Sequence, residues 1–182
     1  MSSAAKYTAD EALEKLKAGN KSYLDAATGT GDISPAIREK TCNEGQFPYA
    51  VVITCSDSRV IPESIFSAGI GELFVIRVAG NVIDNHQLGS VEYATEHLGS
   101  PLVLVMGHDR CGAVGAAISS DPKGYVKTIT DQIKAAIGGE TDPFAASCLN
   151  VRNSVKVIEE KLPGLRVCGA IYHIADGRVE FL

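Results

Sequence analysis

Short apolar runs alternate with helix-like segments along this chain, and this alternation limits the folds open to it. Each run contains β-branched residues, and the runs cover residues 49–54, 73–78, 102–106 and 166–174. Between them, apolar residues recur at helical spacing, as in residues 88–98 and 151–162. Strands that alternate with helices predict an α/β fold whose mostly parallel sheet has helices on both faces.

The N-terminal segment precedes the first run and is expected to form an arm. Thr8 and Glu11 have the spacing of a capping box, and an amphipathic helix is predicted to follow as far as Leu24. We expect this helix to project from the domain. Its apolar face must cover either its own sheet or a partner chain, and we predict that the arm, about residues 1–35, serves dimerisation by packing on the partner.

The C-terminal segment is predicted to close the sheet with an antiparallel edge strand. Residues 175–177 have the composition of a hairpin turn, and residues 178–182 follow as a short strand. We find no internal repeat and no second domain, so residues 1–182 are predicted to form one domain. Residues 121–143, rich in Gly, Lys and Asp, are expected to be a variable surface region.

Charge and cysteine content exclude several classes of function. The net charge is −5 and no Lys/Arg block occurs, which argues against a nucleic-acid partner. No apolar stretch approaches the roughly 20 residues of a membrane helix, and the first six residues lack the apolar part of a secretory signal. The five cysteines are odd in number and form no C-x-x-C pair, so reduced thiols in the cytoplasm are expected.

Reactive side chains follow the first and third runs. Cys55, Asp57 and Arg59 stand at alternate positions after the first, and His108 and Cys111 follow the third. In a parallel sheet the carboxyl ends of neighbouring strands gather functional groups at one edge. Two thiolates and an imidazole suit zinc and leave a fourth position for water, although a purely structural role for buried cysteines stays open.

Four segments, in this order, resemble the β-class carbonic anhydrases. They are C-S-D-S-R from residue 55, G-E-L-F-V-I-R-V-A-G-N from 71, G-S-V-E-Y-A from 89 and G-H-D-R-C-G-A-V from 107. The resemblance extends from about residue 9 to the C-terminus. It implies one zinc ion per chain, held by Cys55, His108 and Cys111. It also implies reversible hydration of CO2 to bicarbonate and a proton, by attack of zinc-bound hydroxide.

The resemblance also implies roles for the other site residues. Asp57 and Arg59 form a catalytic dyad in which Arg59 holds Asp57 away from the metal, and Asp57 is a candidate fourth ligand in a closed form of the site. The residues implied to bind substrate are Gln46, Phe74, Ala79, Tyr93 and Gly112.

Assembly and regulation follow from the branch of the family. A second branch has, three residues before the first cysteine, a tryptophan that builds a regulatory bicarbonate site. This chain has Val52 there and no tryptophan, so the plant-type, open-site branch is the closer match. The resemblance implies a homodimer or a dimer-based higher oligomer, in which the neighbouring chain supplies part of the substrate pocket.

Two other functions compete with CO2 hydration. Carbonyl sulfide and carbon disulfide are also linear and apolar, so a hydrolase of either could use the same scaffold. A non-enzymatic zinc or redox module predicts a closed metal site or a reversible disulfide between Cys55 and Cys111. Nothing in a structural zinc site calls for Gln46, Asp57 and Arg59 together, so an enzyme is favoured.

Overall fold

A single five-stranded sheet organises the chain. The computed structural model describes residues 6–26 and 31–182, so part of the predicted arm, residues 1–5 and 27–30, lies outside the described residues. The strands are β1 (Ala50–Thr54), β2 (Leu73–Arg77), β3 (Val103–His108), β4 (Val167–Tyr172) and β5 (Val179–Phe181). Their order is β2-β1-β3-β4-β5, with the first four parallel and β5 antiparallel to β4. The predicted α/β fold is therefore confirmed.

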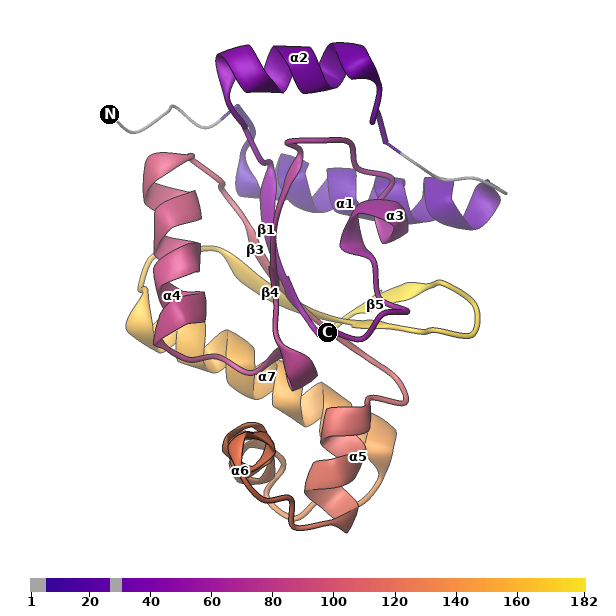
Figure 1. Ribbon diagram of the computed structural model, residues 1–182, viewed down its shortest axis with the longest axis vertical. Helices are drawn as coiled ribbons and strands as arrows, with labels where there is room; N and C mark the ends of the chain where they lie inside the picture. The colour runs from indigo at the N-terminus through magenta and orange to yellow at the C-terminus, as the bar shows by residue number, and fades with distance from the viewer. Residues whose placement is uncertain (1–5, 27–30) are drawn as a thin grey trace.

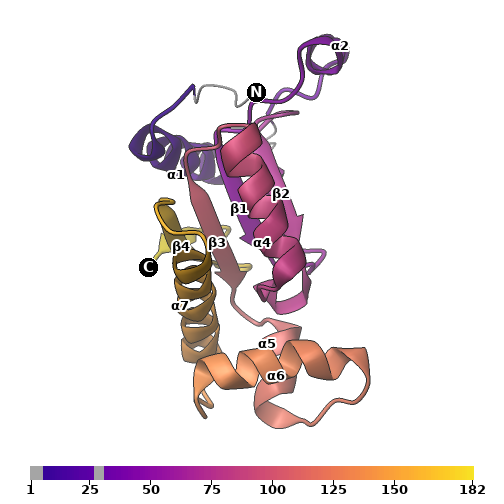
Figure 2. The same cartoon turned by 90° about the vertical axis from the view of Figure 1, so that its left-hand side faces the viewer.

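Helices lie on both faces of the sheet and beyond the carboxyl ends of its strands (Figures 1 and 2). The α-helices are α1 (Ala9–Asp25), α2 (Pro35–Glu44), α3 (Pro62–Ile65), α4 (Asn85–Glu92), α5 (Gly112–Ser119), α6 (Tyr125–Ile137) and α7 (Pro143–Lys161). Helices α4 and α7 cover one face and α1 and α3 the other, whereas α5 and α6 lie past the strand ends. None of the helices in the described ranges has the length and apolar character needed to span a membrane.

Alternate residues of β1 enter two different hydrophobic clusters. Val51 and Ile53 pack on the α4 and α7 side, whereas Ala50 and Val52 pack on the α1 side. All five residues of the strand are buried. A central parallel strand that is covered on both faces has a continuous apolar sequence rather than alternating apolar and polar residues. Residues 49–54 have this continuous apolar pattern.

Helix α1 begins at the predicted capping box and lies on its own sheet. The Glu11 amide donates to the Thr8 hydroxyl, and the Thr8 amide donates to the Glu11 carboxylate. Leu16 is fully buried, and the buried Asn20 side chain accepts from the Val179 amide at 3.0 Å. The sequence predicts a projecting helix, but the inner face of α1 covers the sheet beside α3, so α1 packs on its own chain.

Two helical segments were not anticipated from the sequence. Helix α2 starts at a Ser34 cap with proline in its first turn, but it has no buried residue and therefore no apolar periodicity to detect. Helix α6 lies within residues 121–143, the expected variable surface region. Its Ile133 is fully buried, so this segment contributes to the core.

Candidate metal centre

Three potential metal ligands converge where the strand order changes direction. Cys55 follows the end of β1, His108 ends β3, and Cys111 immediately precedes α5. Because β1 lies between β2 and β3, the chain moves to opposite sides of β1 in successive crossovers, and functional groups collect at such a switch point. The ligand atoms all lie within 4.8 Å of one another, and all three residues are buried. The cluster predicted from the sequence is therefore present.

The His108 ring is oriented as a metal ligand would be. Its Nδ1 lies 2.7 Å from the carbonyl oxygen of Asp109, so Nδ1 carries the hydrogen and donates. Its Nε2 is buried and has no hydrogen-bond partner among the described residues. A buried polar atom without a partner is destabilising, and a metal ion in contact with Nε2 would remove that penalty. The donor set of this cluster fits zinc.

The two thiols of the cluster are electronically unequal. A hydrogen bond with Cys111 lowers the pKa of the Cys55 thiol far below its ordinary value, although burial opposes this shift. The same contact raises the pKa of Cys111. The backbone N–H of Gly80 also donates to Cys55 Sγ, at 3.3 Å. The pair therefore favours a thiolate at Cys55, the form in which cysteine binds metals.

Asp57 is held beside the cluster by a two-point contact with Arg59. Arg59 Nε donates to Oδ1 at 2.9 Å and Nη2 donates to Oδ2 at 2.7 Å, the planar fork that suits a carboxylate. These side-chain hydrogen bonds are the main reason that the pKa of Asp57 lies well below its usual range. Asp57 Oδ2 lies 3.9 Å from His108 Nε2, so an ionised carboxylate borders the ligand set.

A second arginine supports the same loop, and sequence reasoning did not link it to the site. Arg77, the last residue of β2, donates to the carbonyl of Asp57 at 2.7 Å and to that of Cys55 at 3.3 Å. The available signal was its place at the carboxyl end of the run that pairs with β1. Arg59 thus orients the Asp57 side chain, while Arg77 fixes the backbone on which Cys55 and Asp57 stand.

Comparison with known proteins identifies the family. A family model described as carbonic anhydrase matches residues 50–179. A carbonic anhydrase of Mycolicibacterium smegmatis is 39% identical over 93% of this chain and 91% of the relative. One of two tetrameric β-carbonic anhydrases of Sordaria macrospora superposes with a TM-score of 0.73 and 26% identity, over 93% of each chain. This chain belongs to the β-class carbonic anhydrases.

Family membership establishes the reaction. Carbonic anhydrase 2 of Mycobacterium tuberculosis is also 39% identical, over 74% of each chain. The activity of this β-carbonic anhydrase is the hydration of CO2, and the comparisons do not favour hydrolysis of carbonyl sulfide or carbon disulfide. The matched residues run from β1 into β5 and include the whole Cys–His–Cys cluster.

The five predicted substrate-binding residues of this β-carbonic anhydrase divide into two groups. Ala79 precedes Gly80, the donor to Cys55, and Gly112 follows Cys111, so both adjoin the metal cluster. Phe74 pairs with Val51 near the start of β1, about 13 Å along the strand from Cys55 at roughly 3.3 Å per residue.

Tyr93 and Gln46, like Phe74, lie toward the amino ends of the strands. The Tyr93 ring centroid is 6.1 Å from that of Phe74. Gln46 lies before the start of β1, so the length of that strand separates it from Cys55. Within one chain, Gln46, Phe74 and Tyr93 are therefore not brought to the metal cluster.

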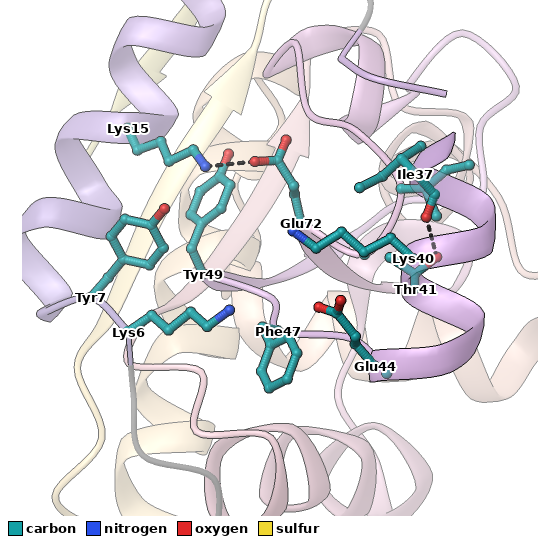
Figure 3. A pocket seen from close by; sticks show the side chains of 13 residues that line it. Lys6, Tyr7, Lys15, Ile37, Lys40, Thr41, Glu44, Phe47, Tyr49 and Glu72 are labelled. Atoms are coloured by element: carbon teal, nitrogen blue, oxygen red, sulfur yellow. Dashed lines mark hydrogen bonds and ion pairs between the residues drawn. The ribbon is translucent and has the colours of Figure 1, made fainter. Parts of the chain in front are cut away.

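A pocket of about 280 Å³ lies at this opposite end, between α1 and α2 (Figure 3). The side chains of Lys6, Lys15 and Lys40 point into it, and Lys15 forms a 2.7 Å ion pair with Glu72. It contains none of the three metal ligands. Its residues Gly45 and Phe47 flank Gln46 in the sequence, so the pocket marks the end of the sheet where Gln46 lies, remote from the chemistry.

Proposed function

We propose that this β-carbonic anhydrase hydrates CO2 with one zinc ion per chain, held by Cys55, His108 and Cys111. The observation that carries this proposal is the buried, unpartnered Nε2 of His108 beside two thiol sulfurs. Zinc bound there would supply a Lewis acid that lowers the pKa of water. Three protein ligands leave a fourth position, as catalytic zinc sites require.

Asp57 and Arg59 are proposed to act directly beside the ligand set. An ionised Asp57 can only accept hydrogen bonds, so a water molecule next to it must turn an O–H toward the carboxylate. The oxygen lone pair is then free to face the carbon of CO2. Arg59 keeps its charge at all relevant pH values and donates to both carboxylate oxygens, so it fixes the direction of the Asp57 carboxylate.

The substrate pocket is proposed to be completed by a second copy of the chain. Phe74 and the half-exposed Tyr93 form an aromatic surface beside β2, an edge strand whose apolar side chains are only partly buried. Uncovered apolar edge strands tend to pair or be covered. The Sordaria relatives are described as tetrameric, which supports a homodimer or a dimer-based oligomer. Together with Gln46, these residues would enter the partner's site.

The single domain of residues 1–182 is proposed to use its N-terminal arm, residues 1–35, in the same contact. Helix α1 lies on its own sheet, but one exposed apolar residue lies in its last turn and another lies just before α2. Leu24 is 46% exposed and Ile33 is 61% exposed. A second chain in contact with the arm would cover these two apolar side chains.

The dimer can be tested with two exposed tyrosines. Light scattering at micromolar concentration is expected to give at least twice the monomer mass of 19.2 kDa. Tyr93→Ser should weaken the dimer, because it removes part of the aromatic surface. Tyr125→Ser is the matched control, since Tyr125 is 93% exposed on α6, away from β2. A fully active monomer would contradict the shared pocket.

Branch, compartment and partners are proposed from the same residues. Val52 is fully buried in β1 and the chain contains no tryptophan, so we propose the plant-type branch without cooperative regulation by bicarbonate. All five cysteines are free, which supports a reducing cytoplasmic location. The net charge of −5 supports the absence of a nucleic-acid partner, leaving CO2 and bicarbonate as ligands.

The metal assignment is tested by removal and return of zinc. Protein with about one zinc per chain is expected to lose CO2 hydration in stopped-flow assays after treatment with a chelator, and to recover it with one equivalent of zinc. Carbonyl sulfide turnover, measured on the same samples, should stay far below CO2 turnover. Full hydration activity in metal-free protein, confirmed by elemental analysis, would overturn the assignment.

A further inference from the structure

The loop that contacts the Cys55 sulfur has an unusual backbone. Gly80 donates its N–H to Cys55 Sγ at 3.3 Å, and this hydrogen bond is buried. Gly80 has a φ of 68° and the following Asn81 a φ of 44°, so two consecutive residues are left-handed. Such a conformation is uncommon outside glycine and persists only where the surroundings fix it.

Helix α7 supplies two side chains that bind this loop. Asn150 Nδ2 donates to the Gly80 carbonyl at 2.8 Å, and Ser154 Oγ donates to the Asn81 carbonyl at 3.2 Å. Both side chains belong to residues that are only 2% exposed. Four positions apart on a helix, they lie on the same face, one turn from each other. Two successive loop carbonyls are thus bound by one helix face.

The remaining surroundings of the loop are apolar and tight. A methyl group added at Gly80 would lie 2.7 Å from Ile133 Cδ1 on α6 and 3.1 Å from Ala113 Cβ on α5. The side-chain nitrogen of Asn81 is buried and has no partner among the described residues, so it does not secure the loop. Helices α5 and α6 limit sideways movement of the loop, and the bonds from α7 set the direction of its peptide groups.

We propose that Asn150 and Ser154 are positioning residues for the metal centre: by fixing the Gly80–Asn81 loop, they hold the Gly80 N–H on the Cys55 sulfur. This inference rests on the proposed zinc site. An N–H donor withdraws electron density from a thiolate and fixes its direction, and outer partners of this kind typically change metal affinity about 10- to 100-fold. Neither residue touches the ligand itself, so each acts through the loop.

The test measures metal retention rather than turnover. Zinc-loaded Ser154→Ala and Asn150→Leu are each mixed with excess chromogenic chelator, and both are expected to release zinc about tenfold faster than the unmodified protein, because the Cys55 sulfur is no longer fixed in direction. In cobalt-substituted samples the sulfur-to-cobalt charge-transfer band should move to longer wavelength, because the thiolate donates more strongly without its hydrogen bond. A loss of stability alone would not shift this band.

Two matched variants separate positioning from packing. Ser147→Ala removes a buried α7 hydroxyl whose one hydrogen bond within the described part of the chain is to the Pro143 carbonyl, and Asn20→Leu removes a buried asparagine from α1. Both controls should keep the original release rate and band, even where their melting temperature falls. Release rates and bands unchanged in Ser154→Ala and Asn150→Leu would overturn the proposal.

Misfolding of a variant and failure of the proposed zinc site each give a result different from failure of the positioning roles. Should Asn150→Leu not fold, Ser154→Ala decides the matter, since it removes a single oxygen atom. If the unmodified protein binds no zinc, the proposed zinc site fails. If it binds zinc, and Ser154→Ala and Asn150→Leu have the same release rate and band as the unmodified protein, the zinc site stands and the positioning roles fail.

Discussion

Replacing His108 with alanine is expected to remove the bound metal and CO2 hydration together. In the proposed site His108 supplies one of three zinc ligands; its ring is buried, and its Nδ1 already donates to the Asp109 carbonyl. Two thiolates alone make a poor zinc site, because closed structural sites use four ligands and catalytic sites keep three. Elemental analysis should find little zinc, and stopped-flow hydration should approach the uncatalysed rate.

Cysteine variants provide the matched comparison for His108→Ala. Cys111→Ser is expected to lose zinc similarly, because a serine hydroxyl is not a thiolate ligand. Cys168→Ser is the control: Cys168 lies in β4 outside the cluster, and burial raises the pKa of its thiol to about 11, so it stays protonated. This control should retain zinc. Full zinc occupancy in both His108→Ala and Cys111→Ser would show that the ligands are wrongly assigned.

Arg59→Ala is expected to abolish most activity while leaving zinc in place. Without the guanidinium fork, the Asp57 carboxylate is free to rotate, and its Oδ2 already lies 3.9 Å from His108 Nε2. A freed carboxylate can become a fourth metal ligand and exclude water. Removal of one oxyanion-hole donor typically lowers kcat about 10²- to 10³-fold, and we expect Arg59→Ala to cause a loss of at least that size.

At neutral pH, Arg59→Ala is expected to change the orientation of Asp57 rather than its charge. Because the pKa of Asp57 is lowered in the folded protein, its pairing with Arg59 stabilises the fold fully above the ordinary aspartate pKa, about 4, and less as the pH falls toward the lowered pKa. At pH 7 Asp57 is ionised with or without Arg59.

Two arginine variants serve as comparisons for Arg59→Ala. Arg59→Lys should recover part of the activity, since an ammonium group is a point charge without the fork. Arg178→Ala, which removes an exposed partner of Glu180 on the C-terminal hairpin, should have no effect. Unchanged hydration in Arg59→Ala would refute the role given to the dyad.

The parts of the site that sequence reasoning located are those that strand ends bring together. Cys55 and His108 follow or end apolar runs that become neighbouring parallel strands, so the topology alone places them side by side. Cys111 comes three residues after His108, at the start of a helix. Asp57 and Arg59 are two residues apart, and charged groups at the buried edge of a sheet need a partner.

The parts that sequence reasoning missed depend on contacts between distant segments. Asn150 contacts Gly80 across 70 positions, and nothing about an asparagine within a helix indicates that partner. Gln46 stands only nine positions before Cys55, yet an extended strand at roughly 3.3 Å per residue carries the two to opposite ends of the sheet. Nearness in sequence is therefore misleading along a strand, whereas nearness of strand ends is informative.

Because the site residues are divided between the two ends of the sheet, the position of a substitution decides which metal centre of the proposed dimer it affects. In that dimer, a substitution at Tyr93 would leave the metal ligands of its own chain intact but would impair the site of the neighbouring chain, whereas a substitution at Asp57 would impair only the site of its own chain. When a chain altered at Tyr93 associates with a chain altered at Asp57, both substitutions affect the same metal centre. The other metal centre then has all of its residues unaltered. Two defective alleles would then complement each other, which two defects within a self-contained site cannot do.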